Sequence, residues 1–93
     1  MNLKDKKILI TGASSGIGQA IAVSCAQKGA SVLIGYRKNL KGAERTLKEI
    51  EKYSKGFIFQ ADLTDEKQIK KMFTEISDKV GQVDILVNNA GDA

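Results

Sequence analysis

Short aliphatic runs and helical patterns alternate along this chain, and this alternation restricts the fold more than any other feature of the sequence. The aliphatic runs have the length and composition of strands that are buried on both faces of a sheet. These runs lie at residues 7–11, 31–35, 56–60 and 83–88. The segments between them carry apolar residues at three- and four-residue spacing, which is typical of helices. These segments lie at residues 16–28, 40–53 and 65–80, the last with a cap at Thr64 or Asp65.

The order β-α-β-α-β-α-β predicts an α/β fold with a parallel sheet. Strands separated by helices pair in parallel, and the crossovers between them are right-handed. The expected arrangement is a doubly wound parallel sheet with spatial strand order 3-2-1-4. In that arrangement the third helix lies alone on one face and the fourth strand is an open edge, so apolar strand surface stays uncovered. We therefore expect residues 1–93 to be the N-terminal part of a single domain in a longer protein.

The composition excludes several kinds of site within this chain. It contains no histidine and one cysteine, Cys25, which rules out a Ser-His-Asp or Cys-His nucleophile pair, an intrachain disulfide and a Cys/His zinc site. The net charge is +4, but basic and acidic residues are interleaved, as at 48–52, which argues against a nucleic-acid partner. The first apolar run, at 8–10, is too short for a secretory or membrane segment. We therefore expect a cytoplasmic protein that contacts no membrane.

A glycine-rich run joins the first predicted strand to the first predicted helix, with the sequence Thr11-Gly12-Ala13-Ser14-Ser15-Gly16-Ile17-Gly18. Gly12 permits a tight turn, Gly16 lets a pyrophosphate approach the backbone, and Gly18 lets the helix pack close to the sheet. The helix N-terminus supplies N–H groups and a positive dipole, and the two serines add hydroxyl donors. The alternative is a plain glycine turn without a ligand, but the place of the run between strand and helix favours a phosphate site.

This run resembles the T-G-x-x-x-G-I-G cofactor motif of the short-chain dehydrogenase/reductase family. Asn88-Asn89-Ala90-Gly91, at the end of the fourth predicted strand, resembles that family's N-N-A-G motif. The resemblance covers the N-terminal part of the family's Rossmann-type fold. It implies an enzyme that transfers a hydride between a nicotinamide cofactor and a small carbonyl or alcohol substrate, and a homo-oligomer for the full-length form. The family's catalytic serine, tyrosine and lysine follow the fourth strand, so the resemblance implies no catalytic residue within this chain.

The resemblance also implies how two further segments contact the cofactor. Asp62 and Leu63 would contact the adenine ring, while residues 88–91 would lie under the adenosine ribose and brace the central strands. The alternatives are that Asp62 and Thr64 only form a turn and cap the third helix, and that 88–91 is only a strand-ending turn. The predicted cofactor-binding residues are Thr11, Gly12, Ser14, Ser15, Gly16, Ile17, Gly18, Tyr36, Arg37, Asp62, Leu63, Asn88, Asn89, Ala90 and Gly91.

Tyr36 and Arg37, which follow the second predicted strand, favour NADP(H) over NAD(H). In dinucleotide-binding folds an acidic residue here binds the ribose 2′-hydroxyl of NAD, whereas an arginine accommodates the 2′-phosphate of NADP. Tyr36 stands at the acidic position, and Arg37 can pair with a phosphate through a bidentate fork. The alternative is that Arg37 and Lys38 are ordinary solvated cations, in which case NAD(H) is also a possible cofactor.

Two apolar stripes are expected to pack in the core rather than to bind a ligand. Ile17, Ile21 and Cys25 share one face of the first predicted helix, where a cysteine behaves as a small apolar residue. The stripe of the third predicted helix consists of Ile69, Met72, Phe73, Ile76 and Val80.

The sequence leaves two functions open. One is the cofactor-binding segment of an NADP-dependent short-chain oxidoreductase, which the end of the chain just after the fourth strand favours. The other is a non-catalytic nucleotide-binding module, or a truncated remnant without enzyme activity. In either case the predicted ligand is a nucleotide, and no metal site is expected.

Overall fold

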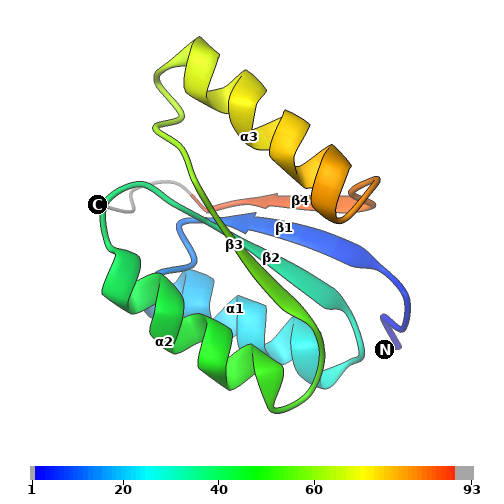
Figure 1. The fold of residues 1–93 in the computed structure, drawn as a ribbon. Helices are drawn as coiled ribbons and strands as arrows, with labels where there is room; N and C mark the ends of the chain where they lie inside the picture. Colours follow the sequence, from blue (N-terminus) through cyan, green and yellow to red (C-terminus); the bar gives the residue numbers. More distant parts are fainter. Residues whose placement is uncertain (1, 90–93) are drawn as a thin grey trace.

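The computed structural model describes residues 2–89, and strands and helices alternate through them as the sequence predicts (Figure 1). The observed bounds differ from the predicted ones by no more than two residues, which is usual at the ends of such elements. The elements are β1 (Lys7–Thr11), α1 (Gly16–Gln27), β2 (Ser31–Tyr36), α2 (Leu40–Glu51), β3 (Gly56–Gln60), α3 (Glu66–Lys79) and β4 (Ile85–Asn88).

The four strands form one parallel sheet in the predicted order β3-β2-β1-β4. Thr11 at the end of β1 lies opposite Gly35 of β2 on one side and Asn88 of β4 on the other. Tyr36 of β2 lies opposite Gln60 of β3. This register brings the carboxyl ends of all four strands to the same edge, so the loops that follow them are neighbours.

Helices α1 and α2 cover one face of the sheet, and α3 lies on the other (Figure 1). Alternate residues of the central strands supply the two cores, because successive side chains of a strand point to opposite faces. Ile8 and Ile10 pack with the first two helices, whereas Leu9 packs with Met72 and Ile76 of α3. The two-layer burial of β1 and β2 explains why their sequences are continuously aliphatic.

The predicted apolar face of α1 is only partly right. Ile17 is 73% exposed, and Ile21 and Cys25 are only partly buried at the margin of the core. The buried residues are small and lie one position further along, at Gly18, Ala22 and Ala26. The physical reason is the close approach of α1 to the sheet, since a Cβ on Gly18 would overlap the carbonyl oxygen of Gly12. A bulky face would hold the helix too far away.

The predicted stripe of α3 is only partly right. Met72 and Ile76 are buried, but Phe73 is 43% exposed. On the same side of the sheet, Leu86 of β4, which pairs with Leu9, is also exposed, whereas the exposed Ile85 pairs with Ile8 and faces the other side. The expectation that one helix leaves apolar surface uncovered here is therefore confirmed for the residues that the structure describes.

Candidate functional site

The loop between β1 and α1 is held close to the end of β4. Gly12 has φ +67°, and a Cβ there would overlap the carbonyl oxygen of Asn89. The side chain of Asn89 in turn donates from Nδ2 to the Gly12 carbonyl oxygen at 3.1 Å. Only glycine combines the left-handed conformation with so close an approach. The structure therefore requires a glycine at position 12 whether or not a ligand binds.

Gly16 lies in a different environment from Gly12 and Gly18. It also has positive φ, +59°, but a Cβ built on it would meet no atom within 4 Å. It is the first residue of α1, and the preceding Ser15 makes no side-chain capping hydrogen bond. Ser14 is buried, whereas Ser15 is exposed. The backbone at the start of α1 is therefore open on the Gly16 side, where a helix N-terminus attracts anions.

Thr11, Asn88 and Asn89 form a hydrogen-bonded connection between β1 and β4. The Thr11 hydroxyl donates to Asn88 Oδ1 at 3.0 Å and accepts from the Asn89 backbone N–H at 3.1 Å. Thr11 is only 6% exposed. These side chains brace the two strand ends, as the resemblance implied. Ala90 and Gly91, the other predicted residues of this segment, lie outside the described residues.

The end of β2 contacts the glycine-rich loop and carries the predicted cofactor-selecting residues. The Gly35 carbonyl oxygen accepts from the backbone N–H groups of Gly12, at 3.0 Å, and Ala13, at 3.4 Å. Arg37 is half-buried, and its Nε is buried with no hydrogen-bond partner among the described residues. The Arg37 carbonyl oxygen accepts from Gln60 Nε2 at 2.9 Å, which fixes the backbone from which the guanidinium extends.

Asp62, after β3, makes the turn that was the alternative to a role in binding. Its Oδ1 accepts from the backbone N–H of Thr64 at 2.9 Å and from the Thr64 hydroxyl at 2.6 Å. The Thr64 hydroxyl, the Thr64 backbone and then the nearby charge of Arg37 hold the pKa of the Asp62 carboxyl below its ordinary value. The cap of α3 is Asp65, which accepts from the N–H groups of Lys67 and Gln68. Asp62 is thus an oriented, ionised carboxylate beside an arginine.

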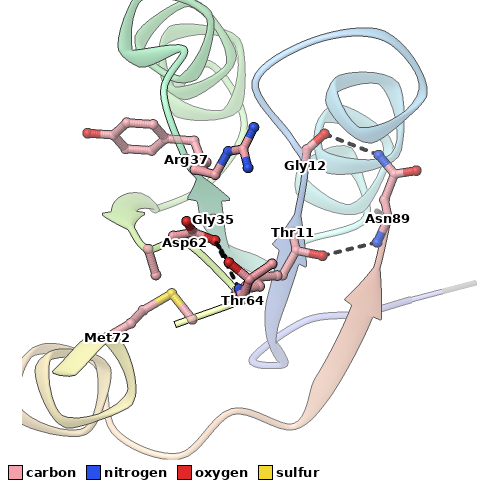
Figure 2. A pocket seen from close by; sticks show the side chains of 11 residues that line it. Thr11, Gly12, Gly35, Arg37, Asp62, Thr64, Met72 and Asn89 are labelled. Atoms are coloured by element: carbon pink, nitrogen blue, oxygen red, sulfur yellow. Dashed lines mark hydrogen bonds between the residues drawn. The ribbon is translucent and has the colours of Figure 1, made fainter. Parts of the chain in front are cut away.

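A cavity of about 120 Å³ lies between these loops at the carboxyl edge of the sheet (Figure 2). Figure 2 shows Arg37, Asp62 and Thr11 around this cavity, with Met72 of α3 also turned toward it. The lining residues are Thr11, Gly12, Gly35, Tyr36, Arg37, Ala61, Asp62, Leu63, Thr64, Met72 and Asn89.

The structure brings about half of the predicted cofactor-binding residues to this cavity. Those that line it are Thr11, Gly12, Tyr36, Arg37, Asp62, Leu63 and Asn89. The others within the described residues lie on the adjoining loop, on the start of α1 or in β4, namely Ser14, Ser15, Gly16, Ile17, Gly18 and Asn88. The predicted set omits the lining residues Gly35, Ala61, Thr64 and Met72. The first three could have been predicted from their positions at or just after the end of a strand. Met72 also belongs to the core, and nothing in the sequence distinguishes it from other core residues.

Other kinds of site find no support in residues 2–89. In this range no group of three or more His, Cys, Asp or Glu side chains could hold a metal ion. None of the helices described here has the length and apolar character needed to cross a membrane.

Comparison with known proteins identifies relatives along nearly the whole chain. The family model for short chain dehydrogenases matches residues 6–93. A 3beta-hydroxysteroid dehydrogenase of Mediterraneibacter gnavus is 39% identical over 87 residues, which are 94% of this chain and 32% of the relative. The 3-oxoacyl-[acyl-carrier-protein] reductase FabG of Staphylococcus aureus is 40% identical over 87 residues, 92% of this chain and 35% of the relative. The chain thus spans about a third of the length of these curated relatives.

The fold is also similar to that of solved enzymes. L-sorbose reductase from Gluconobacter frateurii, solved in complex with NADPH and L-sorbose, superposes with a TM-score of 0.89 at 31% identity. The similarity covers 98% of this chain and 35% of that enzyme. The doubly wound arrangement observed here is therefore the arrangement of about a third of such an enzyme.

Proposed function

This chain belongs to the short-chain dehydrogenase family, and from that membership we propose that it is the NADP(H)-binding segment of an oxidoreductase. The proposal assigns the cavity at the carboxyl edge to the adenosine half of the cofactor. It assigns the open start of α1 to the diphosphate. The observation that carries the choice of NADP(H) is the environment of Arg37.

Arg37 holds a buried N–H donor that lacks an acceptor among the described residues. A guanidinium donor without a partner is unfavourable inside a protein, and a phosphate oxygen is a strong acceptor for it. Tyr36, at the position where an acidic residue would bind the 2′-hydroxyl of NAD, brings no negative charge. The 2′-phosphate of NADP(H) therefore suits this edge of the cavity better than a hydroxyl. The NADPH complex of the similar L-sorbose reductase supports the same choice.

The start of α1 has the features that a diphosphate requires. Gly12 and Gly18 are packed against backbone, while the surroundings of Gly16 are open. Since Ser15 does not cap the helix with its side chain, the first N–H groups of α1 are available to an anion. The cavity lining supplies Ala61, Leu63 and Met72 as apolar walls for the adenine ring. Asp62 supplies a carboxylate acceptor for its exocyclic amine.

The chemistry of the proposed reaction comes from the cofactor, which supplies or accepts a hydride when it is bound. The residues of this chain bind and orient it, and we assign none of them to acid–base catalysis. For the whole protein we propose a small carbonyl or alcohol substrate, a cytoplasmic location and a homo-oligomeric state, in keeping with the family resemblance.

Equilibrium binding tests the cofactor assignment with matched ligands. We expect NADPH to bind more tightly than NADH, and adenosine 2′,5′-bisphosphate to bind more tightly than AMP. The second pair differs only in the 2′-phosphate, so it isolates the contact with Arg37. Equal affinities within both pairs would remove the NADP(H) preference, and no binding of any of the four would remove the nucleotide-binding function.

A second candidate is a nucleotide-binding module without enzyme activity. The exposed apolar residues Phe73, Ile85 and Leu86 fit the uncovered surface that this alternative predicts. The two candidates differ in turnover. Oxidation of NADPH by the full-length protein across a panel of ketones and aldehydes would favour the oxidoreductase, whereas tight binding without oxidation by that protein would favour the module.

A further inference from the structure

We propose that Thr46 of α2 is a positioning residue that holds the glycine-rich loop in the shape that binds the cofactor diphosphate. The inference rests on the proposed function, because it names a residue that supports the same site. Thr46 does not line the cavity, and none of the motifs includes it. Its effect on binding would pass through the backbone of the loop at Ala13 and Ser14.

The Thr46 side chain is fully buried and directed at the loop. Its relative exposure is 0%, and its hydroxyl lies 2.8 Å from the Ala13 carbonyl oxygen, to which it donates. Ala13 is also fully buried. A buried carbonyl depends on the partners that the fold supplies, because water does not reach it. The hydroxyl of Thr46 is one such partner, contributed from 33 residues further along the chain.

The ordinary alternative is that the hydroxyl only bonds back along its own helix. Threonines in helices often donate to the carbonyl four residues earlier, and Gly42 O does lie 3.0 Å from Thr46 Oγ1. However, a carbonyl in this position of an α-helix already accepts the backbone N–H of the residue four positions later. The Ala13 carbonyl belongs to a loop, and no helical N–H group donates to it among the described residues. Two observations favour the Ala13 carbonyl as the acceptor: it lies closer to the Thr46 hydroxyl than the Gly42 carbonyl does, and it does not already accept a hydrogen bond within a helix.

A second contact places the same face of α2 against the loop. A Cβ on Gly42, one turn before Thr46, would overlap the carbonyl oxygen of Ser14. The start of α2 is itself fixed, because Asn39 Oδ1 accepts from the Gly42 N–H at 2.9 Å. Two successive loop carbonyls, those of Ala13 and Ser14, are thus contacted by one helix face.

These contacts complete a support around the loop. From β2, the Gly35 carbonyl oxygen accepts from the N–H groups of Gly12 and Ala13. From α2, Thr46 and Gly42 contact the carbonyls of the next peptide groups. The loop is therefore held on both sides directly before the open start of α1. Loss of the Thr46 hydroxyl should let the loop relax and misplace the N–H groups that face a diphosphate.

The experiment compares three substitutions in the full-length protein that contains this chain. Thr46→Val keeps the shape and branching of the side chain but removes the hydroxyl. Thr46→Ser keeps the hydroxyl and removes the methyl group. Ile50→Val is the control, because it removes a buried methylene from the same helix one turn further from the loop and also lowers stability. The ligands are NADPH, NADH and ADP, which share the diphosphate and differ in the 2′-phosphate and the nicotinamide.

We expect Thr46→Val to weaken the binding of all three ligands about tenfold (about 1.4 kcal/mol). The NADPH to NADH ratio should stay unchanged, since the 2′-phosphate site is elsewhere. Thr46→Ser should lie within about twofold of the wild type, and Ile50→Val should bind as the wild type does once the folded fraction is accounted for. If Thr46→Val behaves as Ile50→Val does, Thr46 is merely structural and the proposal is wrong.

Amide hydrogen exchange separates this inference from the proposed function. If the wild type binds no nucleotide, the proposed function fails while the support of the loop can still be measured. The Gly12 and Ala13 N–H groups, which donate to Gly35, should then lose protection in Thr46→Val but not in Ile50→Val. Unchanged protection in Thr46→Val would overturn the positioning role independently of any ligand.

Discussion

Replacement of Arg37 by aspartate is the perturbation that most directly tests the proposed selection of NADP(H) over NAD(H). Arg37 is half-buried and lines the cavity, and its Nε has no acceptor among the described residues. The lowered pKa of Asp62 keeps its carboxylate ionised, and the positive charge of Arg37 is close enough to contribute to this lowering. Arg37→Asp therefore removes the phosphate-pairing donors and places a second negative charge beside an existing carboxylate.

The size of the effect follows from the contacts that are lost. A hydrogen bond to a charged group contributes roughly 1.5–3 kcal/mol, and a bidentate pair offers two. Arg37 is half-exposed, so solvent screens part of this energy. We therefore expect a loss of about 2–3 kcal/mol, which is roughly a 30- to 150-fold increase in the Kd for NADPH. The Kd for NADH should change by less than about threefold, because NADH lacks the 2′-phosphate.

Isothermal titration with both cofactors at fixed ionic strength measures the two constants. Lys38→Asp is the matched control, because it makes the same charge change at the next residue, which is exposed and does not line the cavity. The control should weaken NADPH binding by less than about 1 kcal/mol. Equal losses for NADPH and NADH in Arg37→Asp, or equal effects of the two substitutions on NADPH, would refute a specific contact between Arg37 and the 2′-phosphate.

Three further changes test the geometry of the site. Gly18→Ala forces a Cβ against the backbone and should lower the free energy of unfolding by more than about 2 kcal/mol. Gly16→Ala places its Cβ in open space and should lower it by only about 1 kcal/mol, the cost of the left-handed conformation. Thermal melts of the two variants measure this difference. Asn89→Ala should cost about 1–2 kcal/mol in urea denaturation, because the Gly12 carbonyl loses its donor. Folding lowers the pKa of Asp62, so the ionised carboxylate stabilises the fold fully above the unfolded pKa of about 3.9, and this stabilisation is lost as the pH falls below it. The free energy of unfolding of Asp62→Asn should therefore depend less on pH in this acid range than that of the wild type. An equal pH dependence of the two proteins would contradict this role.

The fold could be predicted almost completely because its pattern is local. Each central strand is buried on both faces and reads as a continuous aliphatic run, and each helix ends near a glycine or a polar cap. The error in α1 arose where local pattern and tertiary contact disagree. Ile17 is the more hydrophobic residue, but Gly18 meets the carbonyl of Gly12, so the helix turns its small residues to the sheet. Hydrophobicity indicates which residues prefer burial, but it does not indicate how closely two elements must approach.

The site was less predictable than the fold, for a reason that differs from residue to residue. Arg37 and Asp62 carry charge directly after strands, so their place at the edge could be inferred from the sequence, although their binding roles remain predictions. Met72 has the ordinary spacing of a core residue, and the sequence does not distinguish a core wall from a cavity wall. Thr46 reaches the loop across 33 residues, and that contact exists only once α2 is packed.

The composition of the cavity shows why strand ends are a better guide to this site than side-chain chemistry. Gly35 and Ala61 have no polar side chain, yet they line the cavity because β2 ends near one and β3 ends just before the other. Ser14 and Ser15 have hydroxyls, yet neither lines it. In a parallel sheet every crossover returns the chain so that the next strand ends at the same edge. The alternation that fixes the fold therefore also gathers the loops of the site, and in the proposed function the side chains on those loops would determine which nucleotide is preferred.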